Sequence, residues 1–383
     1  MAPERLFTPR FFLMCGFSFT VFLSAFQLLP TAPYRILDLG GTPAIAGLFL
    51  GFLTYSSALT APITGSLVDR FGPRRVMIIA GIALAVFSLL YSALPGYRLM
   101  LALVIVHGFF WSGLLSASGT YISTVVPSSR RAEGIGYWGL STVLAAAVAP
   151  TIGLWVYGRG GWTAMCVEAA IINVVMAVIA WSLPSEDAPR VHRKMQIEWR
   201  VLLLSATLFM YAFGYGGITS FVALYTDING VTPSGLYFIV FCLTTVVTRP
   251  FSGRLGDRIG YRRVFLPCVA LVALAFALLA AGGSKPMLII SAMVFGTGFG
   301  SAYPVFLAHL MQHVDESRRG AMFGSIIGAF DTGIGTGSIV LGSIVQRSGY
   351  HTAWATCAVL AACAIPFYLL VEPRVVNGLR AAR

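Results

Sequence analysis

The amino-acid sequence predicts an all-α membrane protein with twelve transmembrane helices in two pseudo-symmetric six-helix bundles. Of its 383 residues, 57% are hydrophobic and only 10% are charged, whereas soluble domains average about 25% charged residues. The apolar residues form runs close to the roughly 20 residues that a helix needs to cross a bilayer. A basic turn between two such runs recurs 188 residues later, from Gly65 to Gly253, so the chain repeats one unit in the same orientation.

The repeated turn reads GSLVDRFGPRR at residues 65–75 and GRLGDRIGYRR at residues 253–263, with seven of eleven positions identical. Glycine allows the positive φ of a tight reversal, and the aspartate can accept hydrogen bonds from free N–H groups at a helix start. The arginines stay charged, which holds the turn in water or among lipid headgroups. Two ordinary basic loops are the alternative, but a match of this length, placed twice, argues against them. The motif residues are Gly65, Asp69, Arg70, Gly72, Arg74 and Arg75, and Gly253, Asp257, Arg258, Gly260, Arg262 and Arg263.

Twelve apolar runs account for most of the chain. The first, from Phe11, lacks a small-residue cleavage pattern, so we expect a retained span rather than a signal peptide. The polar stretch 184–197 is the expected cytoplasmic linker between an N-terminal bundle, 1–183, and a C-terminal bundle, 198–383. A parallel duplication of hydrophobic halves is typical of membrane transporters. The expected spans are 11–32, 44–66, 76–95, 99–124, 135–157, 162–183, 198–222, 234–253, 264–282, 286–312, 320–346 and 351–371.

The basic residues predict the orientation of these spans. On the side that holds the N-terminus lie 20 Lys and Arg residues, five lie on the other side, and Arg249 lies within a span. Because cytoplasmic loops carry the excess of Lys and Arg, we expect both termini in the cytoplasm. The net charge of +12 therefore does not indicate nucleic-acid binding, since the charge lies in short loops against lipid.

Cysteine and histidine give no clear metal-site pattern. No CxxC pair occurs, and the cysteines lie in apolar runs, so we expect small packing or lipid-facing residues rather than disulfides or metal ligands. His309 and His313 are four residues apart and would share a helix face, but only two ligands are visible at a helix end that favours His. We expect neither a metal nor a cofactor. The cysteines are Cys15, Cys166, Cys242, Cys268, Cys357 and Cys363.

Over essentially its whole length the chain resembles the major facilitator superfamily. The two turns match the signature G-x-x-x-D-R-x-G-R-R, although Pro73 and Tyr261 depart from it at the first Arg. The strings TRPFSGRLGDRIGYRR, HGFFWSG, SSRRAEGIGYWGL and FDTGIGTG are similar to bacterial drug- and sugar-efflux members. The resemblance implies two six-helix bundles that rock around a central cavity, alternating access, and often exchange of substrate for protons.

Two further motifs of the resembling efflux members are changed here. Val104 stands where the family has an Arg four residues before Gly108, so any proton coupling needs another residue. In the helix-5 pattern G-x8-G-x3-G-P-x2-G, alanine replaces two of the glycines. The pattern therefore predicts that this helix packs closely against a neighbour, but less closely than in the family. Generic helix packing is the alternative. The positions of the pattern are Gly136, Ala145, Ala149, Pro150 and Gly153.

Asp331 is the expected proton-coupling residue. It lies eleven residues into the span 320–346, about 16 Å deep at 1.5 Å per residue, which is near the midplane. An ionisable residue at this depth is costly and usually functional. The alternative is a structural hydrogen bond to a neighbouring helix. Glycines that permit close approach of another helix flank it at Gly320, Gly324, Gly328, Gly333, Gly335 and Gly337.

Other polar residues complete the candidate site. Arg249 lies near the cytoplasmic edge, where it either locks the second turn or contacts an anion or the substrate, and Glu168 is the expected outer-rim residue. In the resembling family, helices 1, 4, 7 and 10 line the cavity, and packing remains the alternative for each lining residue. Carried over to this sequence, the lining candidates are Gln27, His107, Trp111, Ser112, Tyr211, Tyr215 and Tyr303.

Together with the resemblance, these features predict a monomeric transporter of the bacterial inner membrane, not an enzyme, that exports a small organic molecule in exchange for protons. A metabolite importer or a uniporter of the same fold is the first alternative. A non-transporting membrane sensor or an enzyme is the second. Against an enzyme, no nucleophile, base and oxyanion donor occur together at a span end, and the longest loop is too short for a sensor's output domain.

Overall fold

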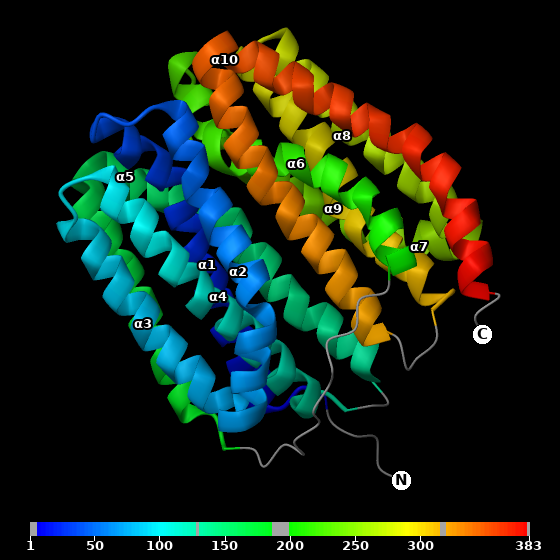
Figure 1. Cartoon of the computed structure of the whole chain (residues 1–383), viewed down its shortest axis with the longest axis horizontal. Helices are drawn as coiled ribbons and strands as arrows, with labels where there is room; N and C mark the ends of the chain where they lie inside the picture. The colour runs from blue at the N-terminus through cyan, green and yellow to red at the C-terminus, as the bar shows by residue number, and fades with distance from the viewer. Residues whose placement is uncertain (1–5, 128–129, 186–198, 315–318, 381–383) are drawn as a thin grey trace. The chain divides into compact units, whose positions relative to one another are not determined.

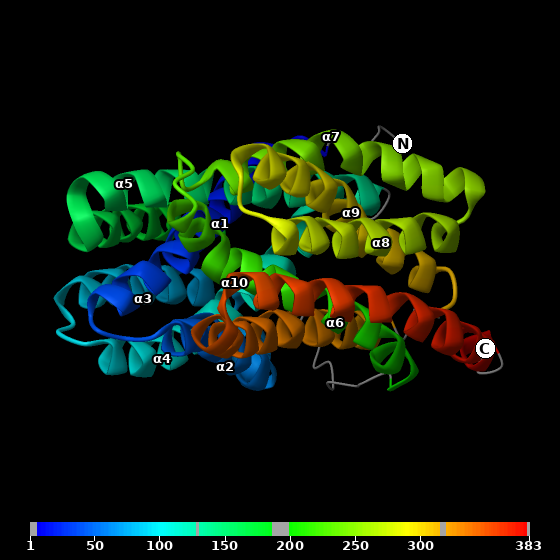
Figure 2. The ribbon, with the colours of Figure 1, turned by 90° about the horizontal axis from the view of Figure 1, so that it is seen from above.

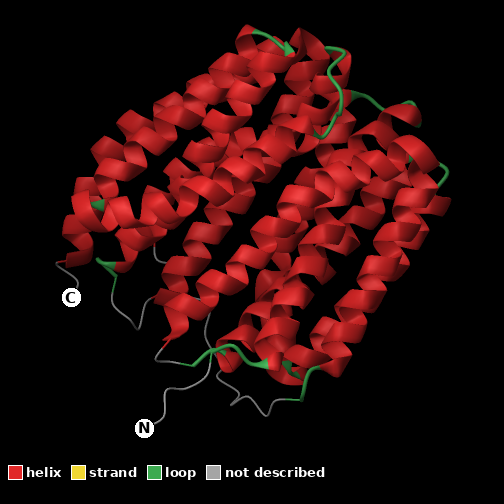
Figure 3. Ribbon diagram, turned by 180° about the vertical axis from the view of Figure 1, so that it is seen from behind, coloured by secondary structure: helices red, strands yellow, loops and turns green. Residues whose placement is uncertain are grey.

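The computed structural model describes residues 6–127, 130–185, 199–314 and 319–380, and all regular secondary structure in these ranges is helical (Figures 1 and 3). Most of the expected linker 184–197 lies outside the described residues. The helical elements are α1 (Pro9–Asp38), α2 (Pro43–Phe71), α3 (Pro73–Ala93), α4 (Tyr97–Val125), α5 (Arg131–Ser182), α6 (Trp199–Ile228), α7 (Leu236–Ile259), α8 (Tyr261–Ala281), α9 (Lys285–Met311) and α10 (Arg319–Arg380).

The helix boundaries follow local chemistry. α1 starts after Thr8, whose Oγ1 accepts a hydrogen bond from the Phe11 N–H at 3.2 Å and so satisfies a free donor of the first turn. α3 starts with Pro73 directly after Gly72, and Pro is favoured at the first helical position because its missing N–H is not needed there. The basic turns thus separate helices by a single glycine.

The backbone repeats with the period expected from the sequence. Gly72 has a φ of 85°, and Gly260, 188 residues later, has a φ of 95°. The long elements α5 and α10 each contain one non-helical residue, Gly161 with a φ of 71° and Gly349 with a φ of 78°, again 188 residues apart. A positive φ is accessible to Gly at little cost, so both halves of the chain reverse direction at equivalent glycines.

The described helices have the length and apolarity of membrane spans. Nine of them could cross a bilayer, or ten if the two segments of α7, Leu236–Arg249 and Phe251–Ile259, form one span with a 42° bend. Pro250 lies at this bend and lacks the N–H that would continue the hydrogen-bond ladder. Large apolar side chains such as Leu59, 76% exposed, lie on the surface, which suits a lipid solvent.

The helices pack into two compact units. Unit 1 comprises residues 1–39 and 55–194, and unit 2 comprises residues 40–54 and 195–383. In unit 1, α5 packs against α1 and α3, around a core that includes Phe17, Leu114 and Met176. In unit 2, α10 packs against α6, and α9 packs against α7 and α8. Figure 2 shows α8 and α9 side by side. The first turns of α2 therefore belong with unit 2.

Glycine allows very close packing inside unit 2. A Cβ added at Gly337 of α10 would lie 1.9 Å from the Phe213 carbonyl oxygen of α6, and one at Gly216 would lie 2.0 Å from the Ile334 oxygen. At Gly324, by contrast, nothing lies within 4 Å of an added Cβ. Small residues are the usual means by which membrane helices bring their backbones together. The close contact therefore begins just after Asp331 and holds this part of α10 against α6.

Candidate functional site

The two basic turns are anchored in the same way but to different acceptors. Arg74 of α3 donates from Nη2 to the Trp181 carbonyl oxygen of α5 at 2.6 Å, and its guanidinium lies 5.8 Å from the centre of the Trp181 ring. Arg262 is the equivalent residue of the second turn, and its Nη1 lies 3.4 Å from Oε2 of Glu372 in α10. Each arginine thus ties its turn to the last helical segment of its own unit.

The other motif residues stay in or beside the turns. The Tyr261 hydroxyl donates to Oδ1 of Asp257, which spans one helical turn across Gly260. The Arg70 guanidinium lies 5.3 Å from the centre of the Phe71 ring. Asp69 is partly buried at the end of α2. Its expected contact at Arg319–Gly320 falls on side chains outside those described and stays a prediction. The remaining motif residues lie in the helices on either side of the turns: Gly65 near the end of α2, Gly253 and Arg258 near the end of α7, Arg75 at the start of α3 and Arg263 at the start of α8.

Asp331 lies with two other sequence-predicted residues in unit 2. It is partly buried on α10 and interacts electrostatically with the Tyr303 hydroxyl of α9. The same hydroxyl interacts with the Arg249 guanidinium of α7. Among the described residues, neither Asp331 nor Arg249 has an ion-pair partner within 4 Å. Tyr303 therefore interacts with both an acidic and a basic group, which form no ion pair with each other, and the three residues come from three different helices.

Aromatic rings form one wall of this group. Tyr215 of α6 stacks on Phe299 of α9 with ring centres 4.4 Å apart. Tyr211 meets the edge of Phe299 at 5.3 Å, and Phe330, directly before Asp331, packs against Tyr303 at 5.3 Å. Such offset and edge-to-face pairs are favourable aromatic geometries. The aromatic wall, defined as Tyr211, Tyr215, Phe299, Tyr303 and Phe330, is continuous through the Phe299–Phe330 contact at 5.9 Å.

One hydroxyl of the wall lacks a partner. Tyr211 is fully buried, and its hydroxyl oxygen has no hydrogen-bond partner among the described residues. Its nearest charged or titratable neighbours include Tyr303, with which it interacts electrostatically. A buried polar group without a hydrogen bond is costly, so this hydroxyl is available to a ligand group that reaches the wall.

The candidates of the first half do not gather in a comparable group. His107 is buried, with Nδ1 at 3.4 Å from the Tyr91 hydroxyl of α3. Ser112 shares a hydrogen bond of 3.0 Å with Thr64 of α2, and Trp111 meets the edge of the Phe22 ring at 5.7 Å. These three side chains join α4 to α3, α2 and α1 respectively, so each is engaged in packing within unit 1.

Gln27 is the exception in unit 1. Its side chain is 0% exposed, and both amide atoms lack a hydrogen bond of good geometry, although the side chain faces Glu168. A Cβ added at Gly153 of α5 would lie 2.8 Å from the Gln27 Cβ, so α1 and α5 touch here. Pro150 is buried one turn earlier in α5, whereas Gly136 is exposed with nothing within 4 Å of an added Cβ.

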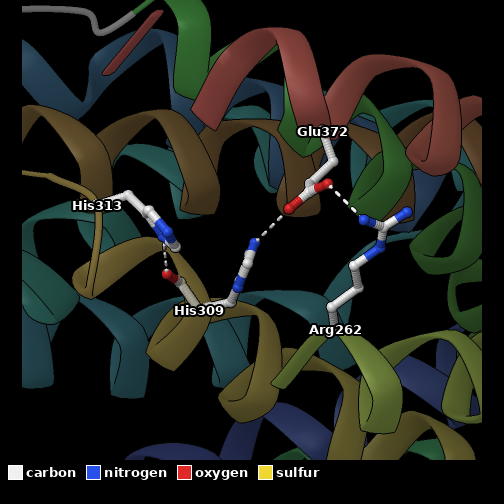
Figure 4. Close-up of polar contacts among 4 residues, drawn as sticks. All are labelled: Arg262, His309, His313 and Glu372. Atoms are coloured by element: carbon white, nitrogen blue, oxygen red, sulfur yellow. Dashed lines mark hydrogen bonds and ion pairs between the residues drawn. The ribbon is translucent and has the colours of Figure 1, made fainter. Parts of the chain in front are cut away.

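Sequence reasoning missed Glu372. This residue lies just beyond the last expected span, and its side chain is only 8% exposed. Its Oε1 lies 3.1 Å from Nε2 of His309, and its Oε2 faces Arg262 (Figure 4). The chain has few acidic residues, so a carboxylate within three residues of an expected span end could have indicated this site. His313 points instead to the His309 backbone, with Nδ1 at 2.8 Å from the carbonyl oxygen. Within the described ranges, no group of three metal-ligating side chains occurs.

Comparison with known proteins adds a family and a fold. A family model described as the Major Facilitator Superfamily matches residues 12–232 and 204–383. The chain is 22% identical over 377 residues to the staphylopine export protein of Staphylococcus aureus, covering 92% of this chain and 94% of that protein. It is 23% identical over 363 residues to the multi-drug resistance efflux pump PmrA of Streptococcus pneumoniae, covering 90% and 91%.

Solved structures with a similar fold belong to several kinds of transporter. The crystal structure of the nucleoside transporter NupG superimposes with a TM-score of 0.75 at 16% identity, covering 95% of this chain and 99% of that chain. A bacterial homolog of the human lysosomal transporter Spinster, in an inward-facing and occupied conformation, also gives a TM-score of 0.75 at 16% identity, covering 95% and 96%. At these identities the likeness shows the fold alone.

Proposed function

The chain belongs to the Major Facilitator Superfamily, and we propose that this membrane transporter exports a small organic molecule by alternating access in exchange for protons. Export is supported by relatives named as a staphylopine export protein, as a multi-drug resistance efflux pump and as a multidrug resistance protein. Proton exchange is supported by Asp331, a carboxyl that interacts electrostatically with Tyr303 and directly follows Phe330 of the aromatic wall. The placement of Asp331 is the observation that carries the proposal.

The proposed topology has twelve spans with both termini in the cytoplasm. The breaks at Gly161 and Gly349 would divide α5 and α10 into two spans each, which adds two to the elements described. The excess of Lys and Arg on one side supports a cytoplasmic location for both basic turns. In this topology, residues 1–183 and 198–383 form the two bundles, and residues 184–197 connect them as a cytoplasmic linker.

The proposed roles in the site follow from charge and shape. The ionised form of a carboxyl is costly at membrane depth, so Asp331 would hold a proton in one access state and release it in the other. Arg249 would stabilise the ionised state through Tyr303, which interacts with both groups. Stacked rings such as Tyr215 and Phe299 offer a large, weakly polar surface to an organic substrate. The carboxyl would thus couple proton loading to occupation of the aromatic wall.

Transport into proteoliposomes tests the proposal. With ethidium and staphylopine as probes, we expect accumulation only when the vesicle interior is made acidic, because protons must leave as substrate enters. Accumulation driven by an alkaline interior would instead indicate a proton symporter and hence an importer. Equilibration that is independent of the pH gradient would indicate a uniporter of the same fold.

A further inference from the structure

Glu372 joins three elements of unit 2. It lies on the second segment of α10, with Arg262 from the start of α8 on one side and His309 from the end of α9 on the other (Figure 4). Arg262 Nη1 lies 3.4 Å from one carboxylate oxygen, and His309 Nε2 lies 3.1 Å from the other. We define Arg262, His309, His313, Tyr368 and Glu372 as the Glu372 cluster.

The two partners of Glu372 are in different surroundings. The Arg262 side chain is 46% exposed, whereas the His309 side chain is 9% exposed. An exposed ion pair contributes little, because water solvates the separated charges almost as well. A buried charge needs its partner, since removing that partner leaves it uncompensated. A charged His309 would therefore hold Glu372 more firmly than Arg262 does.

The hydrogen bonds around His309 leave room for one more proton on its ring. His313 Nδ1 faces the His309 carbonyl oxygen and must donate to it, because a carbonyl only accepts. His309 Nε2 donates to Glu372, which it can do both as neutral imidazole and as imidazolium. The neighbouring Tyr368 hydroxyl, one turn before Glu372, is buried and has no hydrogen-bond partner among the described residues. Adding a proton at His309 therefore breaks no existing hydrogen bond.

We propose that the Glu372 cluster is a proton-binding site that controls the second basic turn. When His309 is neutral, Arg262 is the only charged partner of Glu372 among the residues that the structure describes, and it stays bound to the carboxylate. When His309 takes up a proton, the imidazolium pairs with Glu372 and repels the Arg262 guanidinium, which is half exposed and moves into water. His313 and Tyr368 are the other titratable groups facing the pair: His313 Nδ1 bonds the His309 carbonyl oxygen, and the Tyr368 hydroxyl interacts electrostatically with Glu372 and Arg262.

The first turn provides a natural comparison. Arg74, the equivalent of Arg262, is held by the carbonyl oxygen of Trp181, an acceptor that does not titrate. Protonation should therefore release the second turn and leave the first in place. The proposed site works without any transported substrate and without Asp331, so its test is independent of the proposed exchange of substrate for protons.

A fluorescent label beside each arginine tests the proposal. In purified full-length protein with Cys15→Ser and Cys363→Ser, a bimane label is attached at Arg263→Cys or, as the matched control, at Arg75→Cys. Both positions are exposed and equivalent in the repeat. We expect the label at position 263 to show one transition between about pH 5 and 8, the range in which His changes charge, and the label at position 75 to show none.

Substitutions of His309 and Glu372 should fix the fluorescence of the label at position 263 at opposite levels. His309→Gln should fix the position-263 signal at its high-pH level, because Arg262 then holds Glu372 at every pH. Glu372→Gln should fix it at the low-pH level, because Arg262 has lost its acceptor. Arg262→Gln should also give a signal without a transition, and it serves if Glu372→Gln fails to fold. His351→Gln, an exposed histidine outside the cluster, should leave the transition unchanged.

Two results would overturn the proposal. The first is a transition that persists in His309→Gln; if His313→Gln then abolishes it, the proton is bound by His313 and not by His309. The second is an equal transition at position 75. A transition that His313→Gln shifts but does not abolish supports the proposal, because a neighbouring charge changes the midpoint and not the site.

Discussion

Arg74 and Arg262 occupy equivalent positions in the two basic turns, yet one binds a backbone carbonyl and the other a carboxylate. The Arg74 acceptor is the Trp181 oxygen at 2.6 Å, and the Arg262 acceptor is Glu372 at 3.4 Å. Both arginines thus tie a turn to the last segment of their own unit. Only the second tie involves groups that can change charge.

The glycine contacts of unit 2 predict where a methyl group is tolerated. Gly337→Ala would place Cβ 1.9 Å from the Phe213 oxygen and should destabilise the protein by about 1–3 kcal/mol, as overpacking does. Gly324→Ala, with nothing within 4 Å, is the matched control and should be neutral or slightly stabilising. Thermal unfolding in detergent measures both. Equal unfolding temperatures for the two variants would show that α10 is not held against α6 in this way.

The proposed topology predicts which sides of the membrane reagents can reach. A cysteine at Gly41 or Lys285 should react with an impermeant maleimide in intact cells, because both positions lie on the side with few basic residues. A cysteine at Arg193, and tags at both termini, should react only after the cells are opened. Labelling of position 193 from outside would contradict the twelve-span topology.

Asp69 is predicted to affect the change between access states rather than substrate binding. A contact that exists in only one state shifts the population between states when it is lost. Asp69→Asn should therefore reduce transport at least ten-fold while changing probe affinity by no more than a few-fold. Transport and binding of ethidium are measured on the same preparation. A loss of affinity with an unchanged maximal rate would place Asp69 in the binding site instead.

The aromatic wall predicts the residues that set affinity. Phe299→Ala removes the ring that contacts Tyr211, Tyr215 and Phe330, and it should weaken ethidium binding several-fold. Phe22→Ala, an aromatic truncation in unit 1, is the control and should leave affinity nearly unchanged. Equilibrium binding in detergent, followed by ethidium fluorescence, separates the two. Similar losses in both variants would indicate general destabilisation rather than a binding surface.

Periodicity explains how much of the fold the sequence could predict. The all-helical membrane architecture follows from apolar runs, and the equivalent reversals at Gly161 and Gly349 follow from the repeat offset, because both are local or periodic signals. The membership of residues 40–54 in unit 2 could not be predicted in this way. It depends on close contacts such as that of Gly47 with the Ser338 oxygen, which only the folded chain brings together.

In the candidate site, too, the sequence predicts features with a local signal but not contacts that only the folded chain creates. Depth in a span singled out Asp331, and the resemblance supplied Tyr303, which interacts with Asp331, and Tyr211, which interacts with Tyr303. Helix number alone, however, could not tell a cavity-facing residue from one that packs, and His107 proves to contact Tyr91. Glu372 was not predicted because its partners are distant in the sequence. Arg262 lies 110 positions before it, and His309 lies 63 positions before it.

The role of Asp331 is tested most directly by a single substitution. Asp331→Asn keeps the shape and hydrogen-bonding capacity of the side chain but cannot take up or release a proton. Asp227→Asn, an exposed carboxyl elsewhere in unit 2, is the matched control and should transport as the unaltered protein does.

The decisive measurement is ethidium accumulation in proteoliposomes with an acidic interior, compared with exchange of ethidium between the two sides when no pH gradient is present. We predict that Asp331→Asn loses accumulation yet retains exchange, because alternating access continues without proton coupling. Accumulation by Asp331→Asn equal to that of the unaltered protein would contradict the coupling role and leave Asp331 as a structural hydrogen-bonding residue.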